Sequence, residues 1–208
     1  MLVTHYQLEA WRFAGTDKSR VALCQLRLGP EPRTVWATNG HYAVKVEALG
    51  EVADADFPVI PGVTWQDAKD GKPILLPVET AKAAAKSLKT IRHQTLPILQ
   101  YARVGLETTG DFTSVVVAVT DLERPTVLRA RMPDAEFPDV ASFFDEFKRD
   151  VCNAPIHLSG LYLADIGSYA ALGAGLWDAR AVVTWEFSGG LDEPMRFSWA
   201  DDEHRVTG

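Results

Sequence analysis

Cysteine is scarce in this sequence, and the two cysteines present, Cys24 and Cys152, lie far apart in the chain. Such a pair does not form the disulfide framework of a small secreted domain, so we expect a reducing, cytoplasmic setting. No apolar run approaches the roughly 20 residues of a membrane-spanning helix. No basic and then apolar leader opens the chain either. These absences predict a protein without a membrane partner.

Basic residues are also fewer than acidic ones: the chain has 21 lysines and arginines and 28 aspartates and glutamates, which gives a net charge of −7. A surface that binds nucleic acid over its whole extent is therefore not expected, although a local basic stripe on an acidic body would fit. The 208 residues, 47% of them hydrophobic, can bury a core in one large domain or two small ones.

The common motifs of catalysis and metal binding are missing. The five histidines are scattered, and neither cysteine stands at metal-ligand spacing from any of them. The sequence has no phosphate-binding loop, dinucleotide fingerprint or nucleophile elbow. We therefore expect no cofactor, no metal site and no enzymatic activity. One enzymatic alternative stays open, in which His41 acts together with nearby carboxylates.

Three helices are predicted. The first follows Thr4, which forms a capping-box pattern with Gln7, and it stops near Gly15. The second begins at Pro77, a favourable residue for a first turn, and its body has the strongest helix propensity in the chain. The third follows Ser159 and has apolar residues spaced for one buried face.

Strand patterns fill most of the remaining sequence. Strands are expected at 21–28, 96–106, 114–120, 126–132, 179–187 and 194–199 and in two hairpin arms around Asn39-Gly40, with a loop at 50–72 and a connector at 137–150. Helices and strands do not alternate one for one, so a parallel doubly wound sheet is not expected. The pattern predicts an α+β protein with antiparallel sheets, in which a helix followed by several strands recurs about three times.

The hairpin at residues 33–48 contains an unusual polar cluster. Its Asn39-Gly40 pair predicts a type I′ turn, because both residues tolerate positive φ angles. The turn alone does not account for Thr38 before the pair or for His41 and Tyr42 after it. The simplest interpretation is that His41 caps its own turn.

One basic feature stands out in the second helix. Lys82, Lys86 and Lys89 recur at i, i+4 and i+7, which places three positive charges on one face. The opposite face is expected to lie close against a sheet and consists mainly of small residues: Ala81, Ala84, Ala85 and Leu88. Arg92 extends this basic run beyond the helix. Such a stripe is commonly only a solvated face. The functional alternative is a sequence-independent contact with phosphates, which needs charges on a rigid element and no base readout.

Several segments together resemble the bacterial DNA polymerase III beta sliding clamp. TVWATNGHYAVKV is similar to the strand-turn-strand of that family, and LLPVETAKAAAKSL to the strand that enters a pore-lining helix. LRARMPDAEFPDVASFF resembles its connector between domains. LSGLYLADIGSYAALG and the strands that follow resemble the end of its last domain. The motifs occur in the family's order and cover nearly the whole chain.

The resemblance implies a peptide-binding groove. In that family the hairpin lines a groove that receives short peptides from polymerases and the clamp loader. By this analogy the groove residues would be Thr38, Gly40, His41 and Tyr42 on one wall and Pro138 and Phe143 on the other. Tyr42 and Ala43 stand where the family has arginine and leucine, which predicts a wider and less basic groove.

The resemblance also implies a DNA-clamp fold built from βαβββ half-units. Residues 1–147 would hold two half-units, like the middle clamp domain, and residues 148–208 one, like the end of the last domain. Full clamps close a ring of twelve half-units around double-stranded DNA, so three per chain would require a tetramer and a fourth would allow a trimer. The residues expected to face DNA are Lys82, Lys86, Lys89, Arg92 and Arg12.

Two functions follow from this resemblance. In the first, the chain is a processivity factor that surrounds duplex DNA as a homo-oligomer and tethers a polymerase. In the second, it is a clamp-like adaptor or decoy that binds partner peptides, or a host clamp, without encircling DNA. The third predicted helix has no lysine or arginine from Leu161 to Leu172, and this favours the second function.

Overall fold

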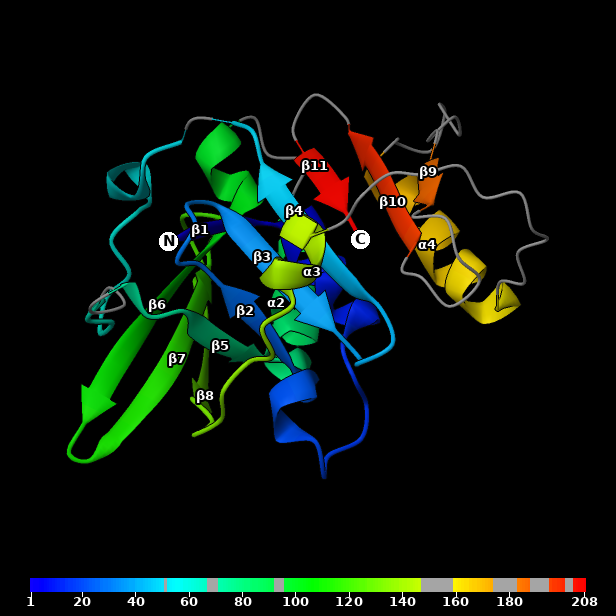
Figure 1. Ribbon diagram of the computed structural model, residues 1–208. Coiled ribbons are helices and arrows are strands. Elements are labelled where there is room, and N and C mark those ends of the chain that lie inside the picture. The colour runs from blue at the N-terminus through cyan, green and yellow to red at the C-terminus, as the bar shows by residue number, and fades with distance from the viewer. Residues whose placement is uncertain are drawn as a thin grey trace.

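Two antiparallel sheets and the helices packed on them make up the protein (Figure 1). The computed structural model describes residues 1–50, 52–66, 71–91, 96–146, 159–173, 183–187, 195–200 and 204–208. The smaller sheet has the order β1 (Leu2–Thr4), β6 (Tyr101–Thr109), β7 (Phe112–Val119) and β8 (Thr126–Arg131). Every strand pairing in both sheets is antiparallel, so the predicted α+β class is confirmed.

The larger sheet joins segments from the two ends of the chain. Its seven strands run in the order β5 (Ile74–Pro77), β2 (Gln25–Leu28), β3 (Thr34–Thr38), β4 (Ala43–Ala48), β11 (His204–Thr207), β10 (Met195–Ala200) and β9 (Thr184–Phe187). Strand β11, which the sequence did not lead us to expect, pairs His204 with Ala48 and Thr207 with Lys45. The ranges 1–147 and 148–208 therefore share one sheet.

The first helix begins at the predicted capping box. The Thr4 hydroxyl accepts a hydrogen bond from the Gln7 backbone N–H over 3.1 Å, and Gln7 Oε1 accepts one from the Thr4 N–H over 3.1 Å. Helix α1 (His5–Leu8) is short, and the chain continues in 3-10 geometry over Glu9–Phe13. The helix thus ends close to the expected position, but more than half of it is wound more tightly than an α-helix.

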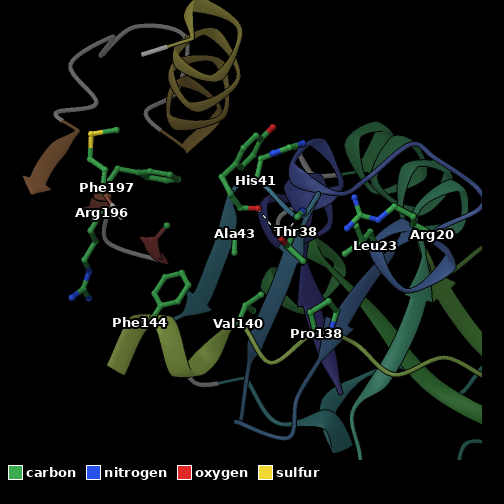
Figure 2. Close-up of a pocket in the computed structure, with 14 residues that line it drawn as sticks. Arg20, Leu23, Thr38, His41, Ala43, Pro138, Val140, Phe144, Arg196 and Phe197 are labelled. Atoms are coloured by element: carbon green, nitrogen blue, oxygen red, sulfur yellow. Dashed lines mark hydrogen bonds between the residues drawn. The ribbon is translucent and has the colours of Figure 1, made fainter. Parts of the chain in front are cut away.

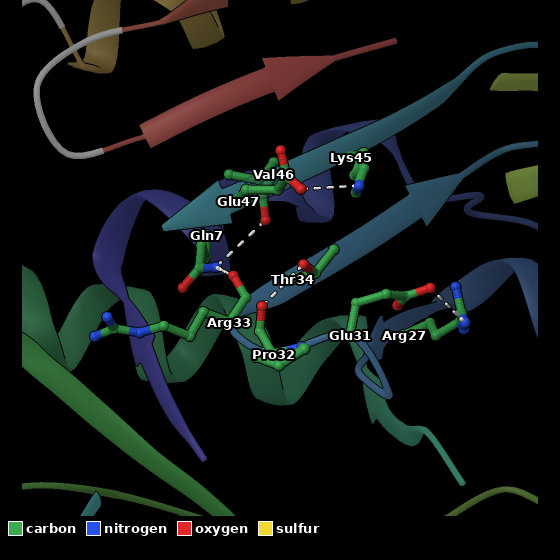
Figure 3. A network of polar contacts seen from close by, with 9 residues as sticks. All are labelled: Gln7, Arg27, Glu31, Pro32, Arg33, Thr34, Lys45, Val46 and Glu47. Atoms are coloured by element: carbon green, nitrogen blue, oxygen red, sulfur yellow. Dashed lines mark hydrogen bonds and ion pairs between the residues drawn. The ribbon is translucent and has the colours of Figure 1, made fainter. Parts of the chain in front are cut away.

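Gln7 also fixes α1 to the larger sheet. Its side chain is fully buried, and Nε2 donates to the carbonyl of Arg33 over 2.6 Å and to that of Val46 over 3.3 Å (Figure 3). Arg33 directly precedes β3 and Val46 lies in β4, so one glutamine amide links the helix start to both arms of the hairpin. A buried polar side chain is tolerated here because its oxygen and nitrogen both have partners.

Helix α2 (Val78–Ile91) follows β5 without a break. Its buried face consists mainly of small side chains, Ala81, Ala84 and Ala85, together with Leu88. Alanine side chains are short, so the backbone of α2 can lie close to the elements that it packs against in the main core. The predicted small-residue face is confirmed.

Two predicted strands begin later than expected. Val21–Cys24 and Pro97–Gln100 each form a 3-10 turn, and the strands β2 and β6 start immediately after them. In the second case Pro97 stands in the first turn, where its fixed φ angle and missing N–H favour a helical start over a strand.

A connector covers the face of the larger sheet that does not carry α2. Phe137 and Val140 pack with Trp36 of β3 and Leu75 of β5 in a separate apolar cluster. Helix α3 (Ala141–Glu146) follows, and Figure 1 shows it on this face in front of β3. The predicted connector is therefore held along the sheet by buried apolar side chains.

Helix α4 (Gly160–Gly173) is anchored to the start of the chain by aromatic residues. Tyr169 stacks on Tyr6 with ring centroids 4.6 Å apart, and its hydroxyl donates to the Tyr6 carbonyl over 2.8 Å. Trp199 of β10 donates from Nε1 to the Tyr6 hydroxyl over 2.8 Å. These contacts place α4 and β10 beside α1, next to the hairpin.

Candidate functional site

The β3–β4 hairpin closes through four residues and not through a two-residue turn. The last pair of the ladder is Thr38 and Ala43, so residues 39–42 form the loop. Gly40 has a φ of 89°, whereas Asn39 is not among the described residues with a positive φ. The predicted type I′ turn is therefore wrong, because Asn39 acts through its side chain: Oδ1 accepts the N–H groups of His41 and Tyr42 over 2.9 and 3.1 Å.

Thr38 organises the same loop from inside. Its hydroxyl donates to the Tyr42 carbonyl over 2.8 Å and accepts the Gly40 N–H over 3.1 Å. The polar cluster of the sequence is thus explained by local hydrogen bonds from Thr38 and Asn39. The His41 side chain is not needed for this turn, and the residue is exposed.

A pocket of about 460 Å³ opens beside the hairpin loop (Figure 2). Hairpin residues meet the turn before β2, the connector and the C-terminal strands around it. The residues that line the pocket are Arg20, Leu23, Thr38, Gly40, His41, Tyr42, Ala43, Pro138, Val140, Phe144, Met195, Arg196, Phe197 and Gly208. The structure therefore brings together five of the predicted groove residues, namely Thr38, Gly40, His41, Tyr42 and Pro138.

The connector contributes an aromatic side chain, Phe144, to the wall of the pocket. Phe144 lines the pocket, and its ring meets Trp36 edge-on at 5.0 Å between centroids. The predicted Phe143 belongs to the same helix, but its side chain lies outside the described part of the structure. Successive helix residues point in different directions, so sequence position alone does not identify which phenylalanine faces the hairpin.

Several lining residues were not among the groove residues that the sequence predicted. Arg20 and Leu23 reach the pocket from the turn before β2, and Arg196 and Phe197 reach it from β10. Figure 2 shows the first pair on one side of the hairpin and the second pair on the other. Phe197 is placed through the C-terminal end of the chain, since its N–H and carbonyl exchange hydrogen bonds with Gly208 over 2.7 and 2.9 Å, and β11 pairs with β4.

The pocket combines an apolar interior with cationic edges. Arg20 and Arg196 line the pocket, and no aspartate or glutamate occurs among the described residues that line it. His41 therefore has no carboxylate beside it within the described lining of the pocket. Across the described residues as a whole, no group of three histidine, cysteine or acidic side chains could hold a metal ion.

Tyr42 connects the pocket to helix α4. Its hydroxyl donates to Asp165 Oδ2 over 3.3 Å, and its ring contacts Tyr162 edge-on at 4.8 Å between centroids. A second edge contact joins it to Phe13 at 5.5 Å. Burial raises the pKa of the Tyr42 phenol to about 12, and the negative charge of Asp165 adds to this shift.

Two of the predicted DNA-facing cations, Lys82 of α2 and Arg12 of the 3-10 segment after α1, lie beside the same residue, Trp11. Lys82 Nζ lies 4.7 Å from the Trp11 ring centroid and 3.0 Å from Glu79 Oε1. The Arg12 guanidinium lies 5.1 Å from the same ring, and its Nε is 2.9 Å from Glu9 Oε2. Both cations therefore already have an acidic and an aromatic partner.

The remaining members of the basic stripe differ in their surroundings. Lys86 and Lys89 are exposed on α2, and among the described residues neither makes a salt bridge. The predicted Arg92 lies outside the described residues. Helix α4 carries one charge, Asp165, and exposes Leu161 and Leu163. No helix among the described residues is long and apolar enough to cross a membrane.

Comparison with known proteins finds similar structures but no similar sequences. No protein-family model and no curated protein sequence matches the chain. The DNA polymerase III beta chain of Streptococcus pneumoniae is 12% identical with a TM-score of 0.47, and the match covers 100% of this chain and 63% of that one. A beta subunit of Eubacterium rectale, which is described as putative, is 10% identical with a TM-score of 0.48, and the match covers 100% of this chain and 63% of that one.

A third similar structure is the DNA polymerase III beta subunit of Thermotoga maritima, at 12% identity and a TM-score of 0.41, over 99% of this chain and 62% of that one. The chain thus spans less than two thirds of the length of these structures. Its sequence differs strongly from that of each of them.

Proposed function

We propose that this protein is a clamp-like factor of DNA replication that binds linear peptides of partner proteins in the pocket beside the β3–β4 hairpin. The observation that carries the proposal is the composition of this pocket: five residues predicted from the sequence to form a peptide groove line it together. In this proposal the pocket binds and does not catalyse, and polymerase and clamp-loader peptides are its ligands.

The chemistry of the pocket suits an extended peptide. Leu23, Val140, Phe144 and Phe197 provide apolar contact area for one or two side chains of the ligand. Gly40 lets the hairpin loop lie close to Arg20 at the edge of the pocket, because a Cβ atom at this position would lie only 3.0 Å from the Arg20 guanidinium. A larger residue would thus compete for the space beside Arg20.

The second half of the proposal concerns DNA. Lys86 and Lys89 lie exposed on a rigid helix, as sequence-independent contact with double-stranded DNA requires. Residues 1–147 would contribute two half-units and residues 148–208 one, so that a tetramer would supply the twelve half-units of a full ring, and a fourth half-unit per chain would allow a trimer. Such loose phosphate contacts would let the ring slide while the pocket holds a polymerase.

One observation favours the alternative of a peptide-binding adaptor that does not encircle DNA. Lys82 and Arg12 are already paired with Glu79 and Glu9, and the described helix α4 carries no cation. Fewer free charges would then face a duplex than the sequence predicted. The pocket would have the same role in both proposals.

Peptide selection tests the pocket. A displayed library of random linear peptides would be enriched on the wild-type protein, and the selected peptide synthesised with a fluorophore for anisotropy measurements. We expect Phe144→Ala to weaken binding about tenfold or more, because an aromatic anchor is lost. Phe112→Ala is the matched control, since Phe112 is exposed on β7. Equal affinity for both variants would disprove the pocket as the binding site.

Solution mass and DNA retention test the ring. Light scattering over a range of concentrations gives the oligomeric state, and retention on closed circular DNA is compared with retention on the same DNA after linearisation. A trimer or tetramer that slides off only linear DNA would support encirclement. A monomer or dimer at every concentration would exclude a ring made by this chain alone and leave the adaptor.

A further inference from the structure

The charge of the pocket is opposite to that of the protein. The chain has a net charge of −7, yet the described lining of the pocket contains two arginines and no carboxylate. The local positive field therefore calls for a ligand of opposite charge.

Arg20 is the better placed of the two arginines. Its backbone is fixed in a turn, where its N–H donates to the Asp17 carbonyl over 3.0 Å and its own carbonyl accepts the Leu23 N–H over 2.9 Å. Its guanidinium lies against Gly40 at the edge of the pocket. Among the described residues Arg20 makes no salt bridge.

Asp17 acts on Arg20 through its charge, but among the described residues the two side chains form no salt bridge. Asp17 Oδ1 accepts hydrogen bonds from the N–H and the hydroxyl of Ser19 over 2.9 and 2.8 Å. These bonds, with a smaller contribution from Arg20, lower the pKa of Asp17. Arg196 has a partner in Glu186, whose Oε2 lies 3.8 Å from its Nε. Arg20 is thus the group most available to a ligand.

We infer that the peptide bound in this pocket is acidic as well as apolar: an aspartate or glutamate next to its apolar anchor meets the Arg20 guanidinium. This inference rests on the proposed peptide-binding function. The apolar anchor would cover Leu23 and Phe144, and the carboxylate would lie at the Gly40 edge. Arginine suits this role because its planar group offers two parallel N–H donors to one carboxylate.

The exposure of Arg20 determines how much the carboxylate of the peptide can add to the binding affinity. Arg20 is exposed, so a pair with it is partly screened by water and salt. We expect the carboxylate to improve the dissociation constant by about two- to fivefold at low salt. The advantage should shrink as the salt concentration rises, whereas the contribution of the apolar anchor should not.

The test uses the peptide selected on the wild-type protein, together with a copy in which each Asp or Glu is replaced by Asn or Gln. The wild type should bind the acidic form about two- to fivefold more tightly, and Arg20→Gln should bind both forms equally. Lys18→Gln is the matched control, since Lys18 is an exposed cation outside the lining of the pocket, and it should keep the full preference.

A charge swap makes the test independent of any loss of affinity. Arg20→Glu should prefer a peptide that has lysine at the acidic position. A selected peptide without an acidic residue, or an acidic preference unchanged in Arg20→Gln, would overturn the inference and leave the proposed function standing. If no peptide binds at all, the proposed function fails, and the inference with it.

Discussion

The hydroxyl of Tyr42 donates a hydrogen bond to Asp165 over 3.3 Å, although the two residues are 123 positions apart in the chain. Tyr42 lines the pocket, and Asp165 is the one charged residue of helix α4. The pair therefore connects the candidate peptide site directly to the C-terminal part of the protein. This link has consequences for stability and for pH dependence.

Removal of either partner should destabilise the protein slightly. We expect Tyr42→Phe and Asp165→Asn each to lower the free energy of unfolding by about 1 kcal/mol, because a partly buried hydrogen bond is lost or weakened. Urea unfolding of both single variants and the double variant checks this. The double variant should lose less than the sum of the two, and strictly additive losses would mean that the pair does not interact in solution.

The raised pKa of Tyr42 predicts a loss of stability at high pH. The neutral phenol is favoured in the folded state, where its pKa is about 12 compared with 10.0 in the unfolded chain. Its contribution is therefore complete below pH 10.0 and is lost as the pH rises toward about 12. The free energy of unfolding, measured across this pH range, should decline less in Tyr42→Phe than in the wild type. Parallel curves would contradict the assigned shift.

Gln7 should be among the most sensitive polar residues of the fold. Replacing it with leucine keeps the approximate volume but leaves the Thr4 N–H and the Arg33 and Val46 carbonyls without this partner. We expect Gln7→Leu to lower the free energy of unfolding by about 2–3 kcal/mol, since buried unsatisfied groups are costly. Gln100→Leu, at an exposed position, should change it little. Denaturant unfolding of the two variants tests this difference.

The features that the sequence predicted well are those set by neighbours in the chain. The Thr4–Gln7 capping box and the small-residue face of α2 depend on spacings of three or four residues, and both occur as expected. The hairpin was located correctly, but its loop was not, because Asn39 binds two backbone N–H groups and thereby replaces the expected turn. Local competition of this kind is difficult to read from residue types alone.

The features that the sequence missed depend on strand pairing over long distances. Phe197 and Arg196 reach the pocket only because β11 inserts between β4 and β10. Nothing in the four residues of β11 indicates which strand edge it will join. Arg20 lies in a turn with no motif, and its position against Gly40 becomes visible only in the folded chain. The contribution of these three residues to the pocket therefore could not be predicted.

The unequal surroundings of the three α2 lysines give the sharpest test of DNA contact. Lys82 is held between Glu79 and Trp11, whereas Lys86 and Lys89 extend into solvent. If α2 faces a duplex, Lys86→Glu and Lys89→Glu should each weaken DNA binding more than Lys82→Glu. Each lost phosphate contact should also reduce the dependence of log affinity on log salt by about 0.9. Lys18→Glu, which makes the same charge change away from α2, controls for net charge. Equal effects of all four substitutions would show that only overall charge matters, which would favour the adaptor over a ring whose α2 helices line the DNA.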